Sequence, residues 1–295
     1  MKVKACIKSM RLRTLPLSLA GVMLGAFIAA SCEGVRIPVI ITLILTASLL
    51  QILSNLSNEL GDTLHGTDTE DRQGIRYSLQ DGEMTVQDMK LLIFITAAAC
   101  CACGAAMVYV SFGTFFAPEP ILFLILGAAA IWAAMHYTLG KNPYGYRGLG
   151  DIFVFIFFGL VSVCGGCYIC LHDPAATLEY AILPACSIGC FSVAVLNVNN
   201  IRDMKTDAAN RVTTAIRLGG TGARIYQTAL ILAGWVSIIA NTLWHGGHCW
   251  YLFLLPLYIA HIKGVWTLEG RALDKMLPLL VMSTFVFSLI AGLGL

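Results

Sequence analysis

Charged side chains are scarce in this chain of 295 residues. Asp, Glu, Lys and Arg together make up 12% of the sequence, about half of the roughly 25% that is usual in soluble proteins. Hydrophobic residues make up 58%. A soluble protein could not cover its surface with so few charged side chains. The composition therefore excludes an ordinary soluble enzyme.

The sequence also lacks a recognisable set of disulfides or soft metal ligands. Most of the 11 cysteines lie inside apolar stretches. Cys164, Cys167 and Cys170 have helical spacing but no flanking metal ligands, and His245 and His248 lie in a short turn without acids nearby. A buried free thiol usually behaves as a small apolar side chain. We therefore interpret the cysteines as packing residues and not as a metal or redox site.

Long apolar stretches are what the sequence has instead. Each is close to the 17–25 residues that an α-helix needs to cross a bilayer, and each must be helical because lipid offers no partners for unpaired backbone groups. We therefore expect an all-α, polytopic membrane protein, a bundle of nine transmembrane helices in one domain that covers residues 1–295. The nine stretches lie near residues 15–32, 37–57, 91–116, 120–139, 152–171, 178–198, 225–243, 249–268 and 276–294.

The basic residues predict which side of the membrane each connection faces. With the N-terminus in the cytoplasm, 18 of the 19 Lys and Arg residues fall in cytoplasmic segments and only Arg36 falls outside. Cytoplasmic loops are enriched in Lys and Arg, so this orientation is strongly favoured, and it places the C-terminus outside. A cleaved signal peptide is the competing interpretation of the first stretch, but the eight stretches that follow favour a first transmembrane span.

Polar residues concentrate in two long connections on the predicted cytoplasmic side, near 58–90 and 199–224. Each begins with Asn and Asp residues three or four apart, a spacing that places them on one face if the preceding helix continues. The two motifs belong to the second and sixth spans and so hint at an internal repeat. The aligned residues are Asn55, Asn58 and Asp62 in the first connection, and Asn199, Asp203 and Asp207 in the second.

Several carboxylates on one face at a membrane boundary repel one another unless a cation neutralises them, and intramembrane acids are functional candidates by default. Asp, Glu and Asn oxygens favour a hard cation, and Mg²⁺ commonly combines one or two carboxylates with substrate phosphates. Basic residues that can bind phosphate oxygens lie nearby. They are Arg72, Arg76, Lys141, Arg202, Lys205 and Arg211. The pattern favours a magnesium-bound diphosphate whose hydrocarbon part extends into the apolar spans.

Four stretches of the sequence resemble the UbiA superfamily of intramembrane aromatic prenyltransferases over nearly the whole chain. They are the opening segment 11–16 (Arg-Leu-Arg-Thr-Leu-Pro), the first acidic motif 55–68, the segment 144–159 that begins Tyr-Gly-Tyr-Arg-Gly-Leu-Gly-Asp, and the second acidic motif 199–219. The acidic motifs indicate the superfamily. The segment 144–159 is most similar to the branch whose acceptor is 1,4-dihydroxy-2-naphthoate.

The resemblance implies a UbiA-like prenyltransferase fold in the inner membrane. The implied reaction joins a polyprenyl chain, supplied as polyprenyl diphosphate, to 1,4-dihydroxy-2-naphthoate with decarboxylation, a step in menaquinone biosynthesis. Mg²⁺ is the implied cofactor, membrane lipid the surrounding partner, and neither a nucleic acid nor an obligate protein partner is expected.

The resemblance also implies roles for individual residues. The metal ligands are expected to be Asn58, Asp62, Asp68, Asn199, Asp203 and Asp207, with Asn55 and Glu59 nearby. The diphosphate is expected to bind Arg72, Lys141, Arg202 and Arg211, and the acceptor Arg11, Arg13, Tyr137, Tyr144 and Tyr146. Asp62, Asp203, Lys141 and Arg72 are the expected catalytic residues.

The chain departs from the family pattern at several positions. Glu59 replaces the usual Asp, Asp151 replaces the usual Glu, and the segment after Asp207 lacks the common Gly-Lys pair, so Arg211 is expected to replace that lysine. Three alternatives stay open: a UbiA-type enzyme with another aromatic acceptor such as 4-hydroxybenzoate, a membrane transporter, and a catalytically idle lipid-binding homologue. The acids lie at one membrane face and the span centres are almost free of charge, which disfavours a transporter.

Overall fold

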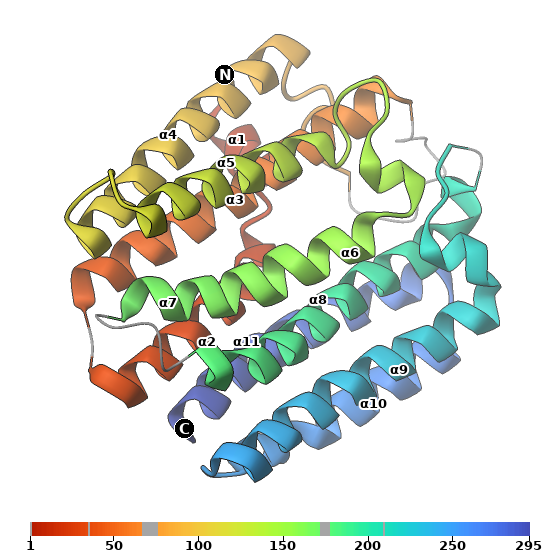
Figure 1. The fold of residues 1–295 in the computed structure, drawn as a ribbon. Helices are drawn as coiled ribbons and strands as arrows, with labels where there is room; N and C mark the ends of the chain where they lie inside the picture. The colour runs from red at the N-terminus through yellow and green to blue at the C-terminus, as the bar shows by residue number, and fades with distance from the viewer. Residues whose placement is uncertain (1, 35, 67–75, 172–177, 209) are drawn as a thin grey trace.

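The computed structural model describes residues 2–34, 36–66, 76–171, 178–208 and 210–295, and within these residues the chain forms helices, turns and loops only (Figure 1). The helices are α1 (Val3–Met10), η1 (Leu12–Thr14), α2 (Leu15–Glu33), α3 (Ile37–Leu64), α4 (Val86–Phe112), α5 (Pro118–His136), η2 (Tyr144–Arg147), α6 (Gly150–Val154), η3 (Phe155–Gly165), α7 (Gly166–Cys170), α8 (Leu178–Asp207), α9 (Thr214–His245), η5 (Trp250–Leu254), α10 (Leu255–Thr267), η6 (Gly270–Lys275) and α11 (Met276–Leu293).

Eight helical stretches in the described part of the chain are long and apolar enough to cross a membrane, and they correspond to eight of the nine predicted spans. The ninth prediction, near 249–268, falls on η5 and α10, which follow each other directly. At about 2.0 Å per residue for the first and about 1.5 Å for the second, the two together cover roughly 30 Å, the thickness of a hydrocarbon core. The predicted all-α membrane bundle is confirmed, with one composite span.

Familiar sequence signals set the helix ends. Proline lies in the first turn of α2, α3, α5 and α10, where its missing N–H costs nothing. Thr85 and Thr213 cap α4 and α9, since each hydroxyl accepts a backbone N–H three residues on. Glycine ends α4, because Gly113 has a φ of 70° that other residues rarely adopt.

Glycines let three helical segments approach closely in the middle of the bundle. A Cβ on Gly25 of α2 would lie 2.7 Å from the backbone nitrogen of Cys167, and one on Gly159 of η3 would lie 2.7 Å from the Cα of Gly189 in α8. Small residues of this kind allow membrane helices to pack backbone against backbone. η3 is also π-helical over Phe155–Gly165, a form that is rare and concentrates at functional sites.

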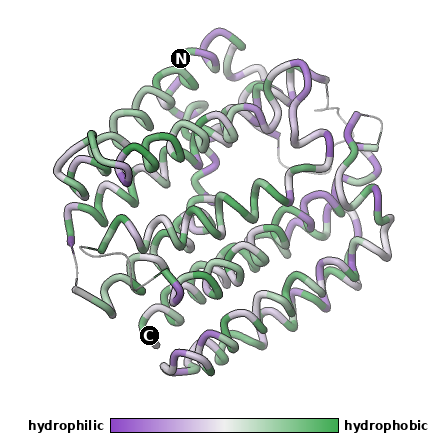
Figure 2. The backbone as a smooth tube through the Cα atoms, in the orientation of Figure 1, coloured by the Kyte–Doolittle hydropathy of each residue, from purple (hydrophilic) through white to green (hydrophobic). Residues whose placement is uncertain are grey.

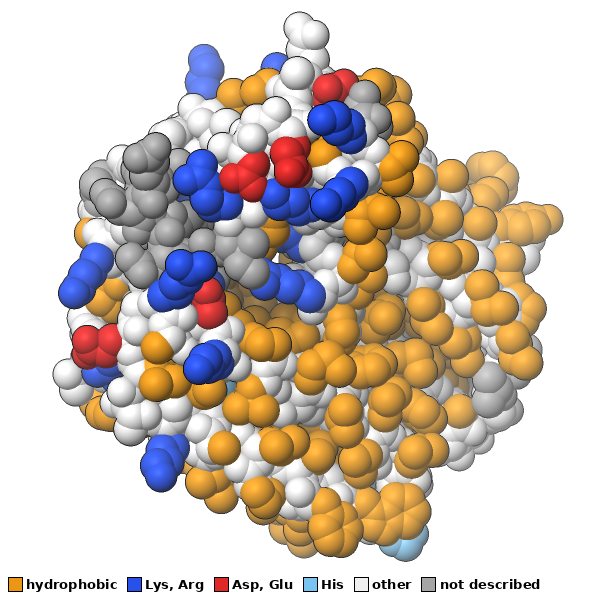
Figure 3. All heavy atoms as spheres, turned by 180° about the vertical axis from the view of Figure 1, so that it is seen from behind, with side chains coloured by type: hydrophobic (Ala, Val, Ile, Leu, Met, Phe, Trp, Pro, Cys, Tyr) orange, Lys and Arg blue, Asp and Glu red, His pale blue; other side chains and the backbone are white. Residues whose placement is uncertain are grey.

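The polar ends of the helices meet at one end of the bundle. The end of α3, the connection between α8 and α9, and η2 lie there together (Figure 1), and hydrophilic residues gather along the same end (Figure 2). Seen from behind, Lys and Arg side chains surround a hollow in this region, whereas apolar side chains cover most of the remaining face (Figure 3). We call this region the polar end.

Arg36, the basic residue predicted to lie outside the cytoplasmic segments, precedes α3 at the end of the bundle opposite the polar end. Its guanidinium donates to the carbonyls of Val110 and Ser111 at 3.0 and 2.9 Å and to that of Leu171 at 3.4 Å. These carbonyls belong to the last turns of two helices, α4 and α7, which have no intrahelical donors. Arg36 therefore ties the two helix ends together.

A buried polar chain holds α8 in place just before its acidic motif. Asn197 donates to the carbonyl of Ala223 at 3.0 Å and to the side-chain oxygen of Gln227 at 2.9 Å. The amide nitrogen of Gln227 lies 3.0 Å from Nε2 of His261. All three polar side chains are fully buried, and hydrogen bonds between buried side chains favour one arrangement of the helices that carry them. It fixes α8 against α9 and α10.

The close approach of α2 and α7 generates a first prediction. In Gly25→Ala, the new Cβ meets backbone that cannot rotate away, so we expect a loss of roughly 1–3 kcal/mol of stability, as for overpacked cores. Gly104→Ala in α4 is the matched control, because its Cβ would meet only the Thr46 methyl at 3.9 Å. Thermal unfolding in detergent should place Gly25→Ala well below both the control and the unaltered protein. Equal melting temperatures for the two variants would contradict the packing described.

Candidate active site

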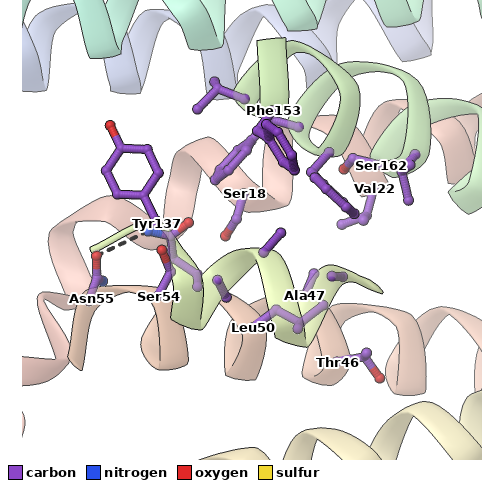
Figure 4. Close-up of a pocket in the computed structure, with 18 of the residues that line it drawn as sticks. Ser18, Val22, Thr46, Ala47, Leu50, Ser54, Asn55, Tyr137, Phe153 and Ser162 are labelled. Carbon is purple, nitrogen blue, oxygen red and sulfur yellow. Dashed lines mark hydrogen bonds between the residues drawn. The ribbon is translucent and has the colours of Figure 1, made fainter. Parts of the chain in front are cut away.

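One elongated cavity of about 350 Å³ begins at the polar end and continues into the apolar interior. Its walls come mainly from α2, α3, α5, η3 and α8. α3 lines it from Leu43 to Asp62, a distance of roughly 28 Å at about 1.5 Å per residue. Figure 4 shows Tyr137, Ser54 and Asn55 near one end of this wall and Thr46 near the other, with Phe153 and Ser162 facing them from the α6–η3 segment.

The two halves of the cavity differ in chemistry. Away from the polar end, its lining residues are apolar or small, and the following belong to this half: Val22, Leu43, Met107, Phe123, Leu126, Gly127, Phe157, Phe158, Val161 and Ile169. At the polar end the lining includes Arg11, Asn58, Asp62, Asn199 and Arg211. The cavity therefore suits a molecule with an anionic head and a long hydrocarbon tail.

Asp62, from the first acidic motif, is held at the polar end of α3. Its carboxylate accepts the hydroxyl of Tyr146 at 2.8 Å and the guanidinium of Arg211 at 2.7 Å. Only 3% of its surface is exposed. Asn58 lies one turn earlier on the same face, where its side-chain oxygen accepts the hydroxyl of Thr138 at 3.3 Å. Both residues line the cavity as their spacing predicted.

Arg211 joins the two acidic motifs. It lies in the connection between α8 and α9, bonds to Asp62, and places Nε 3.6 Å from the carboxylate of Asp207. Its guanidinium also lies 4.5 Å from the ring centroid of Tyr146. Burial lowers the pKa of Arg211, but Asp62 and Asp207 raise it by more, so the net shift is upward. The guanidinium is therefore charged at every physiological pH.

Arg202 binds the polar residues of the second motif in a similar way. Its guanidinium donates to both carboxylate oxygens of Asp203, to Asn199 at 2.7 Å, and to Asp274 of η6. The side chains of Arg202 and Asp203 are 5% and 2% exposed. Charges buried to this degree are stable only when paired, so this cluster anchors η6 to α8.

Aromatic rings line the cavity beside Asp62. The ring of Tyr144 stacks on Phe153 with centroids 4.0 Å apart, and Tyr137 meets Tyr144 edge-on at 5.4 Å. The hydroxyl of Tyr144 donates to the carbonyl of Ala133 at 2.8 Å. Burial raises the pKa of Tyr137 above its ordinary value, so it is a neutral phenol. These faces can stack on a flat ligand and shield a positive charge from water.

Arg11 lies where α1 ends and the cavity begins. Its backbone is left-handed, with φ 50° and ψ 50°, and among the described residues it alone combines a side chain with positive φ. Its guanidinium carbon stacks 3.7 Å above the centroid of the Tyr77 ring. Its Nε and Nη2 are buried and have no hydrogen-bond partner in the described part of the chain. Arg13, by contrast, is exposed and donates to the Tyr77 hydroxyl at 2.7 Å.

Two residues of the first motif bond to neighbouring segments of the chain. Asn55 donates to the carbonyl of Met10 at 2.9 Å and to the hydroxyl of Thr14 at 2.8 Å. Glu59 is fully buried and accepts the backbone N–H of Leu79 at 2.9 Å. They hold the N-terminal segment and the connection before α4, respectively, against α3.

The remaining predicted residues fall into three groups. Asp207 is buried beside Arg211 as described, and Tyr146 contacts both Asp62 and Arg211. Lys141 is exposed and does not line the cavity. Asp68 and Arg72 lie outside the described residues. Within the described residues, no three His, Cys, Asp or Glu side chains converge as a ready-made metal site.

Sequence reasoning missed three residues of this end. Tyr77 lies under Arg11, Asp274 completes the Arg202 cluster, and Gln51 lines the cavity and donates to Thr14 and Asn55 at 3.1 and 3.2 Å. Tyr77 and Asp274 come from connections with no periodic pattern. Only the position of Gln51, four residues before Asn55 on the same helical face, was a usable signal.

Comparisons with known proteins give concordant matches. The model of the UbiA prenyltransferase family matches residues 18–289. A protein of Escherichia coli named 1,4-dihydroxy-2-naphthoate octaprenyltransferase is 38% identical over 300 residues, covering 100% of this chain and 96% of that protein. A protein of the same name in Haemophilus influenzae is 34% identical, with coverages of 100% and 96%.

The fold also resembles a solved structure. The apo structure of a UbiA homolog from Aeropyrum pernix superposes with a TM-score of 0.73, covering 96% of this chain and 97% of that one at 17% sequence identity. The predicted UbiA-like fold is confirmed by this likeness.

The buried Arg202 cluster generates the second prediction. In Arg202→Met, the carboxylate of Asp203 stays buried without its cation, which should cost roughly 3–5 kcal/mol. Arg202→Met combined with Asp203→Leu should recover most of that loss, because the buried carboxylate is removed with its cation and only the partly exposed Asp274 loses its partner. Arg76→Met is the control, since the pair of Arg76 with Asp81 is largely exposed. Thermal unfolding in detergent distinguishes the outcomes, and a double variant no more stable than the single one would refute the pairing argument.

Proposed function

The chain belongs to the UbiA prenyltransferase family, and we propose that it transfers a polyprenyl group from polyprenyl diphosphate to 1,4-dihydroxy-2-naphthoate, with loss of carbon dioxide. The product is demethylmenaquinol, which oxidises to demethylmenaquinone in menaquinone biosynthesis. The similarity at 38% and 34% identity to two proteins named for this reaction, over the whole chain, carries the proposal. Both names specify an octaprenyl donor, and we assign the same donor class here.

The donor set at the polar end fits magnesium. Asn58, Asp62 and Asn199 line the cavity at this end, and Asp203 and Asp207 lie beside Arg202 and Arg211. Carboxylate and amide oxygens are the ligands that a hard cation prefers. Mg²⁺ needs only one or two protein carboxylates when phosphate oxygens complete its shell, so a preformed cage is unnecessary. Asn58, Asp62 and Asp68 would hold it on one side, and Asn199, Asp203 and Asp207 on the other. When bound, Mg²⁺ supplies positive charge that offsets the charge of the departing diphosphate.

The chain's own residues account for binding of the donor. Arg211 is the described basic side chain that reaches into the cavity beside Asp62, so it is placed to donate to the diphosphate. Arg72 and Lys141 would add charge from the connections, whereas Arg202 acts mainly by holding Asp203 and Asn199 in position. The apolar half of the cavity takes the prenyl chain and excludes water.

The reaction then needs a dry, electron-rich surrounding. The allylic C–O bond breaks and its electron pair leaves with the diphosphate. The naphthoate ring carbon bonds to the resulting allylic cation, and cleavage of the bond to the carboxylate returns an electron pair to the ring as carbon dioxide departs. The faces of Tyr137, Tyr144 and Phe153 line the cavity and stabilise positive charge on the prenyl chain.

The acceptor carboxylate pairs with Arg11. The cavity-lining position of Arg11 and its two unpartnered nitrogens support Arg11 over Arg13, which is exposed. An unpaired buried guanidinium is costly unless a ligand completes it. Tyr137 and Tyr144 would stack beside the ring, while Tyr146 acts through Asp62. The protein is a multi-pass membrane protein, and we place its polar end in the cytoplasm because the Lys and Arg residues gather there.

The direct test uses purified protein in detergent with 1,4-dihydroxy-2-naphthoate and an allylic polyprenyl diphosphate, with Mg²⁺ or with EDTA. We expect a prenylated, decarboxylated quinone by mass spectrometry, formed only with the metal. Mg²⁺-dependent product from 4-hydroxybenzoate alone would keep the family chemistry and refute the naphthoate acceptor. Folded protein that prenylates no aromatic acceptor would refute the proposed function.

Substitution of the acidic motifs generates the third prediction. Asp62→Ala and Asp203→Ala should each lower turnover at least ~100-fold, comparable with the loss of one electrostatic group in other active sites. The protein should remain folded because each guanidinium keeps a second carboxylate, Asp207 for Arg211 and Asp274 for Arg202. Asp81→Ala is the matched control, because Asp81 lies at the same polar end but pairs with Lys8 and Arg76 outside the cavity. Normal activity in well-folded Asp62→Ala would exclude the metal assignment.

A further inference from the structure

The connection before α4 contains a residue that the proposed reaction has not used. Tyr77 is 8% exposed, although it lies in a loop, where side chains are usually accessible. Its ring lies under the guanidinium of Arg11 at 3.7 Å, and its hydroxyl accepts from Arg13 at 2.7 Å. Tyr77 is therefore the described side chain that fixes the direction of the Arg11 guanidinium.

The loop that carries Tyr77 is itself fixed. The next residue, Ser78, is fully buried and donates to the carbonyl of Ala5 in α1 at 2.8 Å. Leu79 donates its backbone N–H to Glu59 in α3 at 2.9 Å. The two residues after Tyr77 are thus bonded to two separate helices, α1 and α3. These bonds restrict the position of the Tyr77 ring.

The backbone of Arg11 is fixed from the other side. A left-handed conformation is unfavourable for a residue with a side chain, so it persists only where its surroundings determine it. Asn55 accomplishes this by bonding to the carbonyl of Met10, and Thr14 by bonding to the carbonyl of Arg11 through both its N–H and its hydroxyl. Arg11 is thus held by its backbone through Asn55 and Thr14, and by its side chain through Tyr77.

A guanidinium held in this manner differs from those of Arg202 and Arg211. Arg202 and Arg211 are bonded to carboxylates, whereas Arg11 stacks on a ring, which leaves its in-plane N–H donors available. An arginine stacked on an aromatic face keeps its edge free for a carboxylate. We propose that Tyr77 is a positioning residue that holds Arg11 by cation–π contact so that its guanidinium edge receives the carboxylate of the aromatic acceptor.

This inference rests on the proposed acceptor class, and it is tested by binding rather than turnover. The probes are 1,4-dihydroxy-2-naphthoate and naphthalene-1,4-diol, which differ only in the carboxylate. Their Kd values are measured by ligand fluorescence with detergent-solubilised protein, under argon and without diphosphate. In Tyr77→Leu, the Kd of the naphthoate should rise about 10-fold, the scale of a desolvated cation–π contact. The Kd of the diol should change less than about two-fold.

Two comparisons separate positioning from a general structural effect. Tyr77→Phe keeps the ring and loses only the bond from Arg13, so its Kd for the naphthoate should stay within about two-fold of the unaltered protein. In an Arg11→Met background, Tyr77→Leu should add no further loss, because the pair acts as one unit. Equal weakening of both ligands by Tyr77→Leu, or an undiminished effect without Arg11, would overturn the proposal.

If Tyr77→Leu does not fold, a series of fluorinated phenylalanines at position 77 provides the same test. Each added fluorine weakens the negative potential of the ring face with little change in shape. The Kd of the naphthoate should therefore rise with the number of fluorines, and a flat series would refute the cation–π role.

The outcome also separates this inference from the proposed function. Enzyme that forms product but shows a flat series keeps the function and loses the inference. Enzyme that binds the naphthoate in the predicted pattern but forms no product keeps the arginine position and loses the function. No binding of the naphthoate by the unaltered protein would overturn both.

Discussion

Buried carboxylates at the ends of two membrane helices are the constraint on which the polar end depends. Asp62, Asp203 and Asp207 are each at most 6% exposed, and carboxylates removed from water need a cation within reach. Arg211 and Arg202 meet that need, and each reaches across elements to do so: Arg211 from the α8–α9 connection to α3, and Arg202 from α8 to η6. The charged side chains of the candidate site therefore also form the ion pairs that join its separate helices.

The degree of pairing separates the roles of three arginines that look alike in the sequence. The guanidinium of Arg202 donates to Asp203, Asn199 and Asp274, so its role is structural. Arg211 bonds to carboxylates but also lines the cavity, so it belongs to both the scaffold and the site. Arg11 has a ring beneath it and two unpartnered nitrogens, which is the arrangement that a ligand completes. Burial alone would not have distinguished them, since partners decide what a buried charge does.

Much of this could be predicted from the sequence, because hydrophobic periodicity, charge asymmetry and helical spacing are local properties. The spans followed from apolar length, and the positions of Asn58 and Asp62 on one cavity-lining face followed from their spacing. The contacts of Glu59 and Asn55 were harder to predict. Both residues belong to the same motif, but they bond to Leu79 and Met10. A helix carries side chains in all directions, and only tertiary contacts decide which neighbour each one meets.

The parts that could not be predicted depend on irregular backbone. Tyr77 lies in a loop without periodicity, Arg11 in a left-handed turn that favours glycine or asparagine over arginine, and η3 in a π-helix that no apolar pattern specifies. Lys141 illustrates the converse, because its place beside a family motif suggested phosphate binding while the connection turns it outward. The proposed functional positions thus lie mainly where the conformation that a residue locally prefers differs from the one observed.

Charge also explains how two anionic substrates can share one cavity. On the proposed function, the carboxylates that pair with Arg202 and Arg211 disfavour a bare anion beside them, and a divalent cation would offset that repulsion for the diphosphate. Nε and Nη2 of Arg11 have no hydrogen-bond partner within the described residues, so on the same proposal its guanidinium would attract a carboxylate without a metal. Each substrate is then drawn to the region whose charge it complements and kept from the other. On the proposed function, this difference in charge would direct an anionic acceptor and a metal-bound donor to different parts of one cavity.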